Sequence, residues 1–231
     1  MNTQDFCFIL KQNSHLLREG CFGLEKENVR VNQDGTLALT PHPAVFGDKG
    51  KHPYITTDFS ESQVEIITPA LDKIEETYSF SKALYDIVAL EIGDEILWPQ
   101  SMPCFIPEDD EIPVAKYSEE GREAEEYRNK LLKKYGGKKQ LISGIHYNYS
   151  FNEEIIRKLY ESSDKELTYK EYKNSIYLKV ARNYLRYRWI IVYLLGAAPV
   201  IHESFLNGCS CKLKQISEDG YTVDGAVSHR N

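Results

Sequence analysis

The sequence has little of what marks a secreted, membrane-spanning or nucleic-acid-binding protein. Its five cysteines are odd in number and irregularly spaced, unlike a secreted disulfide framework. The longest charge-free apolar stretch, Trp189 to Ile201, is shorter than the roughly 20 residues of a membrane-spanning helix. The residues Met1 to Asp5 lack the basic start of a signal peptide. A net charge of −7 provides no basic surface for a phosphate backbone. We therefore expect a cytoplasmic protein that binds neither membrane nor nucleic acid.

Common nucleotide and hydrolase motifs are also absent. The chain contains neither G-x-x-x-x-G-K-[ST] nor G-x-G-x-x-G, so a nucleotide would be held through metal ions and side chains. It contains no G-x-S-x-G, which leaves a serine hydrolase without support. Cys209 and Cys211 follow His202, but their spacing differs from that of a zinc knuckle. A structural role is the more common explanation for such a pair.

What is present predicts an α+β fold. Hydrophobic residues make up 42% of the 231 residues and charged residues 27%, as in an ordinary globular protein. Apolar residues at helical spacing predict helices, and alternating apolar and polar residues predict strands. The predicted helices are 5–17, 72–92, 121–135 and 168–195. The predicted strands are 21–31, its hairpin partner 36–40, the end of 54–69, and 140–151. No βαβ regularity connects them, which favours antiparallel pairing.

Polar side chains gather on one face of three predicted strands. Glu25 and Glu27 share a face of the first strand, and Glu61 and Glu65 share a face of the 54–69 segment, preceded by Asp58. In the third strand, one face carries Gln140, Ile142, Gly144, His146, Asn148 and Ser150, and the apolar face carries Leu141, Ile145, Tyr147, Tyr149 and Phe151.

If these faces align in one sheet, four or five carboxylates and one imidazole converge. Such a cluster is unstable without cations, and oxygen-rich sites suit Mg²⁺. Phosphoryl transfer from ATP requires such a site, because the metal ions neutralise charge on the phosphates. Each part alone has a plainer explanation. A Glu-x-Glu strand is usually a solvated face, and a lone strand histidine is more often hydrogen-bonded structure than a ligand.

The predicted helix 168–195 is rich in aromatic and basic residues. These are Tyr172, Tyr177, Tyr184, Tyr187, Trp189, Arg182, Arg186 and Arg188. They could suggest a nucleic-acid-binding face. At helical spacing on a long helix, however, core packing with arginine heads that extend to solvent is the more common explanation, and it is our expectation.

Several sequence strings, in this order, resemble a known family. They are Phe22-Gly-Leu-Glu-Lys-Glu-Asn-Val-Arg-Val31, Ile55-Thr-Thr-Asp-Phe-Ser-Glu61, Glu65-Ile-Ile-Thr-Pro69, Trp98-Pro-Gln-Ser-Met-Pro103, Ile142-Ser-Gly-Ile-His-Tyr-Asn148 and Arg182-Asn-Tyr184. Together they resemble bacterial-type glutamate–cysteine ligase, which is also found as the front part of bifunctional glutathione-synthesis enzymes. The resemblance runs from about Gly20 to Phe205, and Ser228 to Arg230 resembles a further family segment.

The resemblance implies a fold and a reaction. The fold is glutamine-synthetase-like, with an antiparallel sheet curled into a funnel and helices packed outside. In the reaction, Mg²⁺-ATP phosphorylates the γ-carboxylate of L-glutamate and the amine of L-cysteine then displaces phosphate. Two or three Mg²⁺ ions are implied, with Mn²⁺ as an alternative. No protein nucleophile is needed.

The resemblance also implies metal-binding and substrate-binding roles for individual residues, by their place in the motifs. The metal-binding group comprises Glu25, Glu27, Asp58, Glu65 and His146, whereas Glu61 matches less well. Asn148 and Arg230 resemble catalytic residues that hold substrate, and the arginine fork suits a carboxylate. The residues that resemble the pocket for the cysteine substrate are Tyr127, Leu131, Gln140 and Ile142, with Arg128 beside them.

Family members are considerably longer than this chain. We therefore interpret residues 1–231 as the N-terminal part of a single catalytic domain, truncated and nearly inactive alone. Three alternatives stay open: a ligase that joins glutamate to a different amine, a metal-dependent phosphohydrolase that uses the same carboxylates, and a non-catalytic fragment.

Overall fold

The computed structural model describes residues 2–103, 105–196, 200–206 and 213–223, and all structural statements concern these residues. The sequence predictions for Cys209, Cys211 and Ser228 to Arg230 lie outside them. The α-helices are α1 (Thr3–Gln12), α2 (Ile74–Glu91), α3 (Arg122–Tyr135), α4 (Glu153–Glu161) and α5 (Tyr169–Leu195). The 3₁₀ helices are η1 (Ser14–Leu17), η2 (Ala44–Phe46), η3 (Glu119–Gly121), η4 (Lys138–Leu141) and η5 (Glu203–Phe205). The strands are β1 (Gly20–Val31), β2 (Ile55–Thr57), β3 (Gln63–Ile67), β4 (Ile96–Leu97), β5 (Ile145–Phe151), β6 (Ile201–His202), β7 (Leu213–Gln215) and β8 (Gly220–Val223).

The long strand β1 organises an antiparallel five-stranded sheet. One edge of β1 pairs with β3, which in turn pairs with β2. β5 and β4 also pair with β1, along Gly20–Lys26 and Arg30–Val31 respectively. The strands β6, β8 and β7 form a separate antiparallel sheet. With five α-helices around two antiparallel sheets, the described chain has the α+β class that the sequence predicts.

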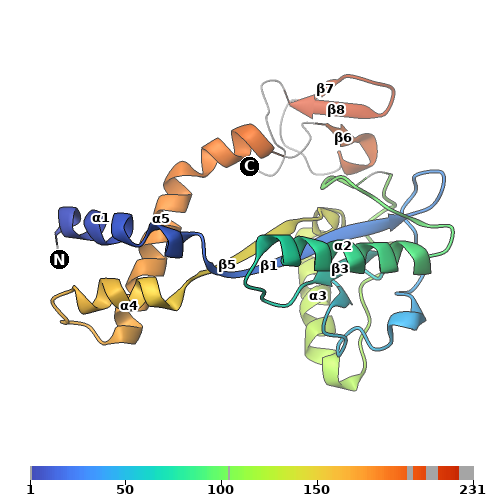
Figure 1. Cartoon of the computed structure of the whole chain (residues 1–231). Coiled ribbons are helices and arrows are strands. Elements are labelled where there is room, and N and C mark those ends of the chain that lie inside the picture. Colours follow the sequence, from blue (N-terminus) through green and yellow to red (C-terminus); the bar gives the residue numbers. More distant parts are fainter. Residues whose placement is uncertain (1, 104, 197–199, 207–212, 224–231) are drawn as a thin grey trace.

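Different elements cover the two faces of the main sheet. On one face, Val64 and Ile66 of β3 pack against Leu84 and Val88 of α2. On the other face, Val29 and Val31 of β1 lie in a core that also contains Leu141, with Leu131 of α3 packed against it. A third core joins α1, α4 and the first half of α5. Figure 1 shows this last group as a separate lobe, connected to the main sheet by the β1–β5 ribbon.

One predicted strand is absent and another begins later than predicted. Residues 36–40 form no strand. The N–H of Leu37 donates to Phe105 O and the N–H of Ala38 donates to Arg30 O, so this segment does not pair continuously with one partner strand. Residues 138–141 form η4 instead of the start of β5. The N–H of Lys138 donates to Asp109 Oδ1 at 2.7 Å, which starts this helical turn. Gln140 and Ile142 are therefore not on a strand face, contrary to the prediction.

The first helix also ends earlier than predicted. α1 stops at Gln12, and the side chain of Asn13 donates back to Ile9 O at 2.9 Å. A turn of 3₁₀ helix then completes the predicted range to Leu17. The predicted bounds of α2, α3 and α5 differ from the observed ones by at most two residues.

The expected core packing of α5 is wrong for its second half. Among the described side chains of α5, only Ile176 is buried, and large apolar residues from Leu178 to Leu195 are exposed. On β5, Ile145 and Tyr147 of the predicted apolar face are exposed as well. Over the described residues, none of the helices combines the length and apolar character needed to cross a membrane.

Candidate functional site

Strand register brings the predicted polar faces together. Glu25 of β1 lies opposite His146 of β5, and Glu27 of β1 lies opposite Glu65 of β3. Because side chains alternate along a strand, all four side chains project from the same face of the sheet. Asn148 pairs with Gly23 and lies on that face as well. The face opposite to this cluster is the one that α2 covers.

Hydrogen bonds connect the cluster across the strands. His146 Nδ1 lies 3.0 Å from Glu25 Oε2, and its Nε2 lies 3.5 Å from Glu27 Oε1. Asn148 Nδ2 donates to Glu25 Oε1 at 2.7 Å. The backbone N–H of Gly144 donates to Glu27 Oε2 at 2.6 Å. One imidazole thus stands between two carboxylates, and an amide and a backbone N–H fix the far oxygens of both.

The electrostatics of the cluster show an excess of negative charge. Burial, followed by repulsion from Asp58, Glu27 and Glu25, raises the pKa of Glu65 to about 7. Burial also raises the pKa of Asp58, against the opposing charge of Arg128. The hydrogen bond with Glu25 raises the pKa of His146. The same bond lowers the pKa of Glu25. A carboxyl group that cannot readily ionise among other carboxylates is the expected result when a cation belongs at the site.

The donor atoms fit a divalent metal ion. One ligand atom from each of Glu25, Glu65 and His146 lies within 4.8 Å of the other two, the spacing of atoms around a shared ion. Two carboxylates and an imidazole suit Mg²⁺ or Mn²⁺, with the carboxylates favouring the harder ion. Glu27 and Asp58 raise the pKa of Glu65 by charge repulsion, so their carboxylates also lie near the cluster. The role of all five as metal ligands stays a prediction.

Glu61 does not belong to this cluster, although alternation put it on the same side as Glu65. Residues 58–62 form a turn, with Gln63 N–H donating to Ser60 O at 2.9 Å, and β3 begins only at Gln63. The Glu61 carboxylate pairs with Lys49 and accepts the N–H groups of His42 and Lys116, both at 2.7 Å. Its buried charge is already compensated, so a structural role replaces the metal-binding one.

The residues predicted to form the pocket for the amine substrate lie on α3, in η4 and just after η4. Arg128 donates through Nε to the backbone oxygen of Asp58 and packs 4.9 Å from the ring of Tyr117. Leu131 packs against the core beneath β1, and Tyr127 is exposed. The remaining two, Gln140 and Ile142, lie in and just after η4, and both are half-buried. Arg128 is therefore adjacent to the cluster through Asp58, while Arg230 lies outside the described residues.

Sequence reasoning missed the segment that holds Glu27. Ser143 donates its N–H to Ser101 O at 2.9 Å, and Ser101 Oγ donates to Ser143 O at 2.6 Å, which fixes the backbone just before Gly144. A cavity of about 520 Å³ adjoins this segment, and Tyr184 and Ile191 of α5 line its other side. Ser143 and Gly144 belong to the motif Ile142–Asn148, but their backbone role depends on long-range contacts, which the sequence pattern does not indicate.

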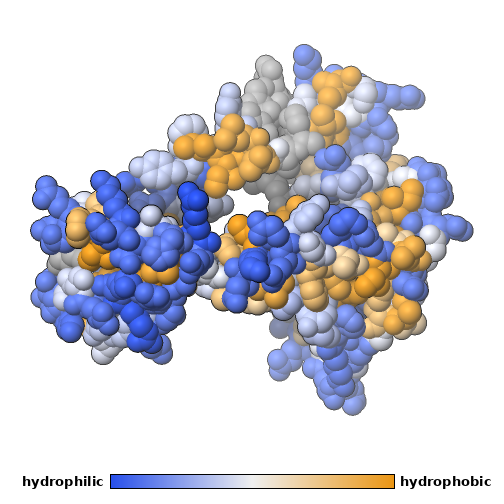
Figure 2. All heavy atoms as spheres, in the orientation of Figure 1, coloured by the Kyte–Doolittle hydropathy of each residue, from blue (hydrophilic) through white to orange (hydrophobic). Residues whose placement is uncertain are grey.

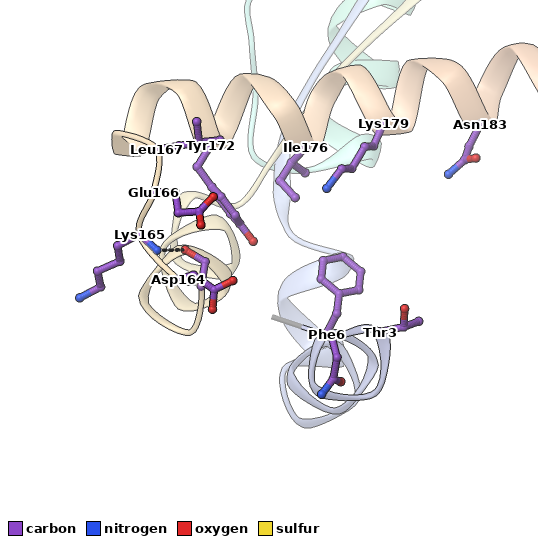
Figure 3. Close-up of a pocket in the computed structure, with 12 residues that line it drawn as sticks. Thr3, Phe6, Asp164, Lys165, Glu166, Leu167, Tyr172, Ile176, Lys179 and Asn183 are labelled. Atoms are coloured by element: carbon purple, nitrogen blue, oxygen red, sulfur yellow. Dashed lines mark hydrogen bonds between the residues drawn. The ribbon is translucent and has the colours of Figure 1, made fainter.

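A second cavity, of about 620 Å³, lies between α1, the loop before α5 and the first half of α5. Figure 3 shows Phe6, Tyr172 and Ile176 of its lining, with Asp164 and Lys165 on the loop. None of the cluster residues lines this cavity. It therefore forms no part of the candidate active site.

The comparisons with known proteins agree with this arrangement. The family model for glutamate-cysteine ligase matches residues 7–231. The chain belongs to the glutamate–cysteine ligase family. A glutathione biosynthesis bifunctional protein GshAB from Desulfotalea psychrophila is 50% identical over 214 residues, which is 92% of this chain and 28% of that protein. A glutamate–cysteine ligase from Clostridium acetobutylicum is 47% identical over 210 residues, which is 89% of this chain and 43% of that ligase.

Solved structures give the same family and confirm the predicted fold class. The glutamate–cysteine ligase from Francisella tularensis, crystallised in complex with AMP, has a TM-score of 0.81 at 32% identity, over 92% of this chain and 42% of that one. A bifunctional glutathione synthetase from Pasteurella multocida has a TM-score of 0.78 at 42% identity, over 84% of this chain and 25% of that one. The chain thus spans between a quarter and just under a half of these relatives.

Proposed function

We propose that residues 1–231 are the N-terminal part of a single catalytic domain that joins the γ-carboxylate of L-glutamate to the amine of L-cysteine at the expense of ATP. The observation that carries the proposal is the convergence of Glu25, Glu65 and His146 from three strands, with ligand atoms within 4.8 Å. Family membership supports the choice of substrates. We also propose a cytoplasmic location, as expected from the sequence.

The donor set fits two or three Mg²⁺ ions, or Mn²⁺, held by Glu25, Glu27, Asp58, Glu65 and His146. Such ions supply positive charge that neutralises the β- and γ-phosphates of ATP. Asn148 already orients Glu25 through a 2.7 Å hydrogen bond, and Gly144 orients Glu27. These contacts hold the carboxylates in place before any substrate arrives, which is the preorganisation that catalysis requires.

The chemistry needs no protein nucleophile. A γ-carboxylate oxygen of glutamate attacks the γ-phosphorus of ATP and ADP leaves. The cysteine amine then attacks the acyl carbon, the C–O bond to phosphate breaks, and the amide forms while hydrogen phosphate leaves with the amine proton. By its place in the motifs, Arg230 suits a substrate carboxylate. Arg128 and Leu131 belong to the residues that the resemblance assigns to the pocket for the cysteine side chain. Water must be excluded until the amine arrives.

Ligand-dependent stabilisation tests this proposal on the chain itself. We expect Mn²⁺-ATP to raise the melting temperature, and L-glutamate to raise it further, because ligands that bind only the folded state stabilise it. Glu65→Gln should abolish the shift. Glu91→Gln, at an exposed carboxylate on α2, is the matched control and should retain it. No shift with the unmodified chain would contradict a folded ATP site.

Turnover separates the ligase from its alternatives. We expect the 231-residue chain to release ADP only near background with glutamate and cysteine, because it spans under half of its relatives. Robust turnover by the chain alone would overturn that expectation. Release of phosphate without glutamate would favour a phosphohydrolase, and preference for a simple amine over cysteine would favour a ligase with a different acceptor.

A further inference from the structure

A buried glutamine lies on the same face of β3 as the predicted metal ligand Glu65. Figure 2 shows hydrophilic residues, in blue, over much of the surface, but Gln63 has none of its area exposed. Its partner across the β1–β3 ladder is Val29, and both Val29 and Phe59 belong to the apolar core. An amide is costly in such surroundings unless its polar atoms are hydrogen-bonded. The partners of this amide therefore indicate what the side chain does.

One end of the Gln63 amide holds the peptide group that follows Asp58. The N–H of Phe59 donates to Gln63 Oε1 at 3.3 Å. The carbonyl oxygen of Asp58, on the other side of the same planar peptide group, accepts from Arg128 Nε. The N–H of Asp58 donates to the backbone oxygen of Gln63 at 3.1 Å. The backbone is thus fixed on both sides of Asp58, and this limits the directions that its side chain can take.

The other end of the amide holds the segment that orients Glu27. Gln63 Nε2 donates to Ser143 Oγ at 3.3 Å, and these two residues are 80 positions apart in the sequence. The residue after Ser143 is Gly144, whose N–H donates to Glu27 Oε2 at 2.6 Å. The N–H of Glu27 donates back to Gly144 O at 3.0 Å. One buried side chain therefore connects the turn that carries Asp58 with the segment that holds the Glu27 carboxylate.

This connection supplies what strand pairing does not. Strand register places the other predicted metal ligands of the cluster, which lie on β1, β3 and β5. Asp58 lies between β2 and β3, and Gly144 lies just before β5, so both are outside the strands. Register alone therefore does not set the distance between the carboxylates of Asp58 and Glu27. The hydrogen bonds of the Gln63 amide join the two segments directly.

We propose that Gln63 is a positioning residue for the metal centre, and that it keeps the Asp58 and Glu27 carboxylates at the separation that bound divalent ions require. The proposal rests on the proposed function, because it assigns both carboxylates to ion binding. Carboxylates that buried hydrogen bonds hold in place lose little conformational freedom when an ion binds. Residues that orient metal ligands raise the ion affinity in this way, although they never touch the ion.

A purely structural role for Gln63 is the competing explanation. A buried amide with two hydrogen bonds stabilises the fold, and its removal lowers the free energy of unfolding because its partners are left unsatisfied. A purely structural role predicts no change in the ion affinity of the folded chain. Stability and ion affinity must therefore be measured on the same variants.

The experiment compares Gln63→Met with Thr77→Val in the 231-residue chain. Methionine resembles glutamine in length but lacks the amide. Thr77 is the matched control, a buried side chain on α2 that donates to Lys73 O at 2.9 Å. Urea denaturation establishes that each variant is folded under the conditions of the titration. Calorimetric titration should then show about tenfold weaker Mn²⁺ binding by Gln63→Met and unchanged binding by Thr77→Val.

Hydrogen exchange provides a second measurement that needs no ion. In Gln63→Met, we expect the amide hydrogens of Phe59 and Gly144 to exchange faster together, because both segments lose their connection. Thr77→Val should leave both exchange rates unchanged. Faster exchange at only one of the two amides would overturn the connection that the proposal requires.

Ser143→Ala tests the same connection from its other end. It removes the acceptor of Gln63 Nε2, so the Phe59 amide should exchange faster although Phe59 does not contact the substituted residue. The double variant should bind Mn²⁺ no more weakly than Gln63→Met alone, because both substitutions break one connection. If Gln63→Met does not fold, Ser143→Ala decides the matter, and unchanged exchange at Phe59 would overturn the proposal.

The outcomes separate the positioning role from the proposed function. Equal Mn²⁺ affinities of Gln63→Met and the unmodified chain would overturn the positioning role, as would effects of the two substitutions that multiply in the double variant. An unmodified chain that binds no Mn²⁺ would contradict the proposed function and the positioning role together. The two failures are distinct, because only the first leaves a chain that binds the ion.

Discussion

Glu61 and Glu65 belong to one short segment of sequence, yet the fold treats their carboxylates in opposite ways. Glu61 is compensated by Lys49 and two backbone N–H groups. Burial alone would raise its pKa, but these hydrogen bonds outweigh burial and lower it. Glu65 faces Asp58, Glu27 and Glu25, and its pKa rises to about 7. The charge of the first carboxylate is compensated within the fold, whereas the charge of the second has no such compensation and would be favoured by a bound cation. Compensation by the chain itself distinguishes a structural acid from a functional one.

The largest effect that we expect separates these roles at Glu61. Glu61→Ala leaves the buried ammonium of Lys49 unpaired and should lower the free energy of unfolding by about 3 kcal/mol. Urea denaturation measures this loss. The Mn²⁺ affinity of the folded fraction should stay unchanged, because Glu61 does not contact the cluster. A loss below about 1 kcal/mol would mean that the Lys49 pair contributes little to stability.

The second effect concerns ion binding at Glu65. Glu65→Gln removes one of the two carboxylates grouped with His146 and should weaken Mn²⁺ binding about 100-fold, or about 2.7 kcal/mol. Calorimetric titration at pH 8 measures it, with Glu91→Gln as the control. Equal affinities for the two variants would remove Glu65 from the ligand set.

The third effect is a loss of stability as pH rises. The pKa of Glu65 is about 7 in the folded chain, above its ordinary value of 4.5. The folded state therefore holds a proton that the unfolded state releases, and stability falls between about pH 4.5 and 7. Partial exposure reduces the effect to about 2 kcal/mol. Without divalent ions, Glu65→Gln should lack this decline, and urea denaturation across that pH range should show the difference. If the unmodified chain and Glu65→Gln lost stability equally over this pH range, the decline would not come from Glu65.

The smallest effect has the opposite sign and lies beside Glu61. Burial and then the charge of Lys49 lower the pKa of His42 from 6.5 to about 4. The unfolded state binds the proton first, so stability falls as pH decreases from about 6.5 to 4, by about 1 to 2 kcal/mol after allowance for partial exposure. His42→Phe should flatten this part of the stability profile in urea titrations. If His42→Phe still lost stability over this pH range to the same extent, other titratable groups would be responsible for the loss.

The sequence predicted the parts of the site that depend on alternation within one strand. Glu25, Glu27 and Glu65 share a face because β1 and β3 are regular where they pair. His146 and Asn148 were placed correctly for the same reason. Side-chain alternation is a local property of each strand. Pairing of β1 with β3 and β5 then places the polar faces of the three strands side by side.

What could not be predicted depends on contacts between distant segments. Glu61 was misplaced because a turn before β3 breaks the alternation. Gln140 lies outside β5 because the hydrogen bond from the Lys138 N–H to Asp109 starts η4. The exposure of α5 was missed because its apolar composition indicates burial without saying which polypeptide provides the cover.

We propose that Glu25, Glu65 and His146 together hold a divalent ion. Electron spin echo measurements on the Mn²⁺-loaded chain test it most directly, because they detect a nitrogen nucleus coordinated to the ion. We predict a histidine nitrogen coupling in the unmodified chain and in Glu61→Ala, and its loss in His146→Asn. Bound Mn²⁺ without nitrogen coupling, or coupling that persists in His146→Asn, would contradict the claim.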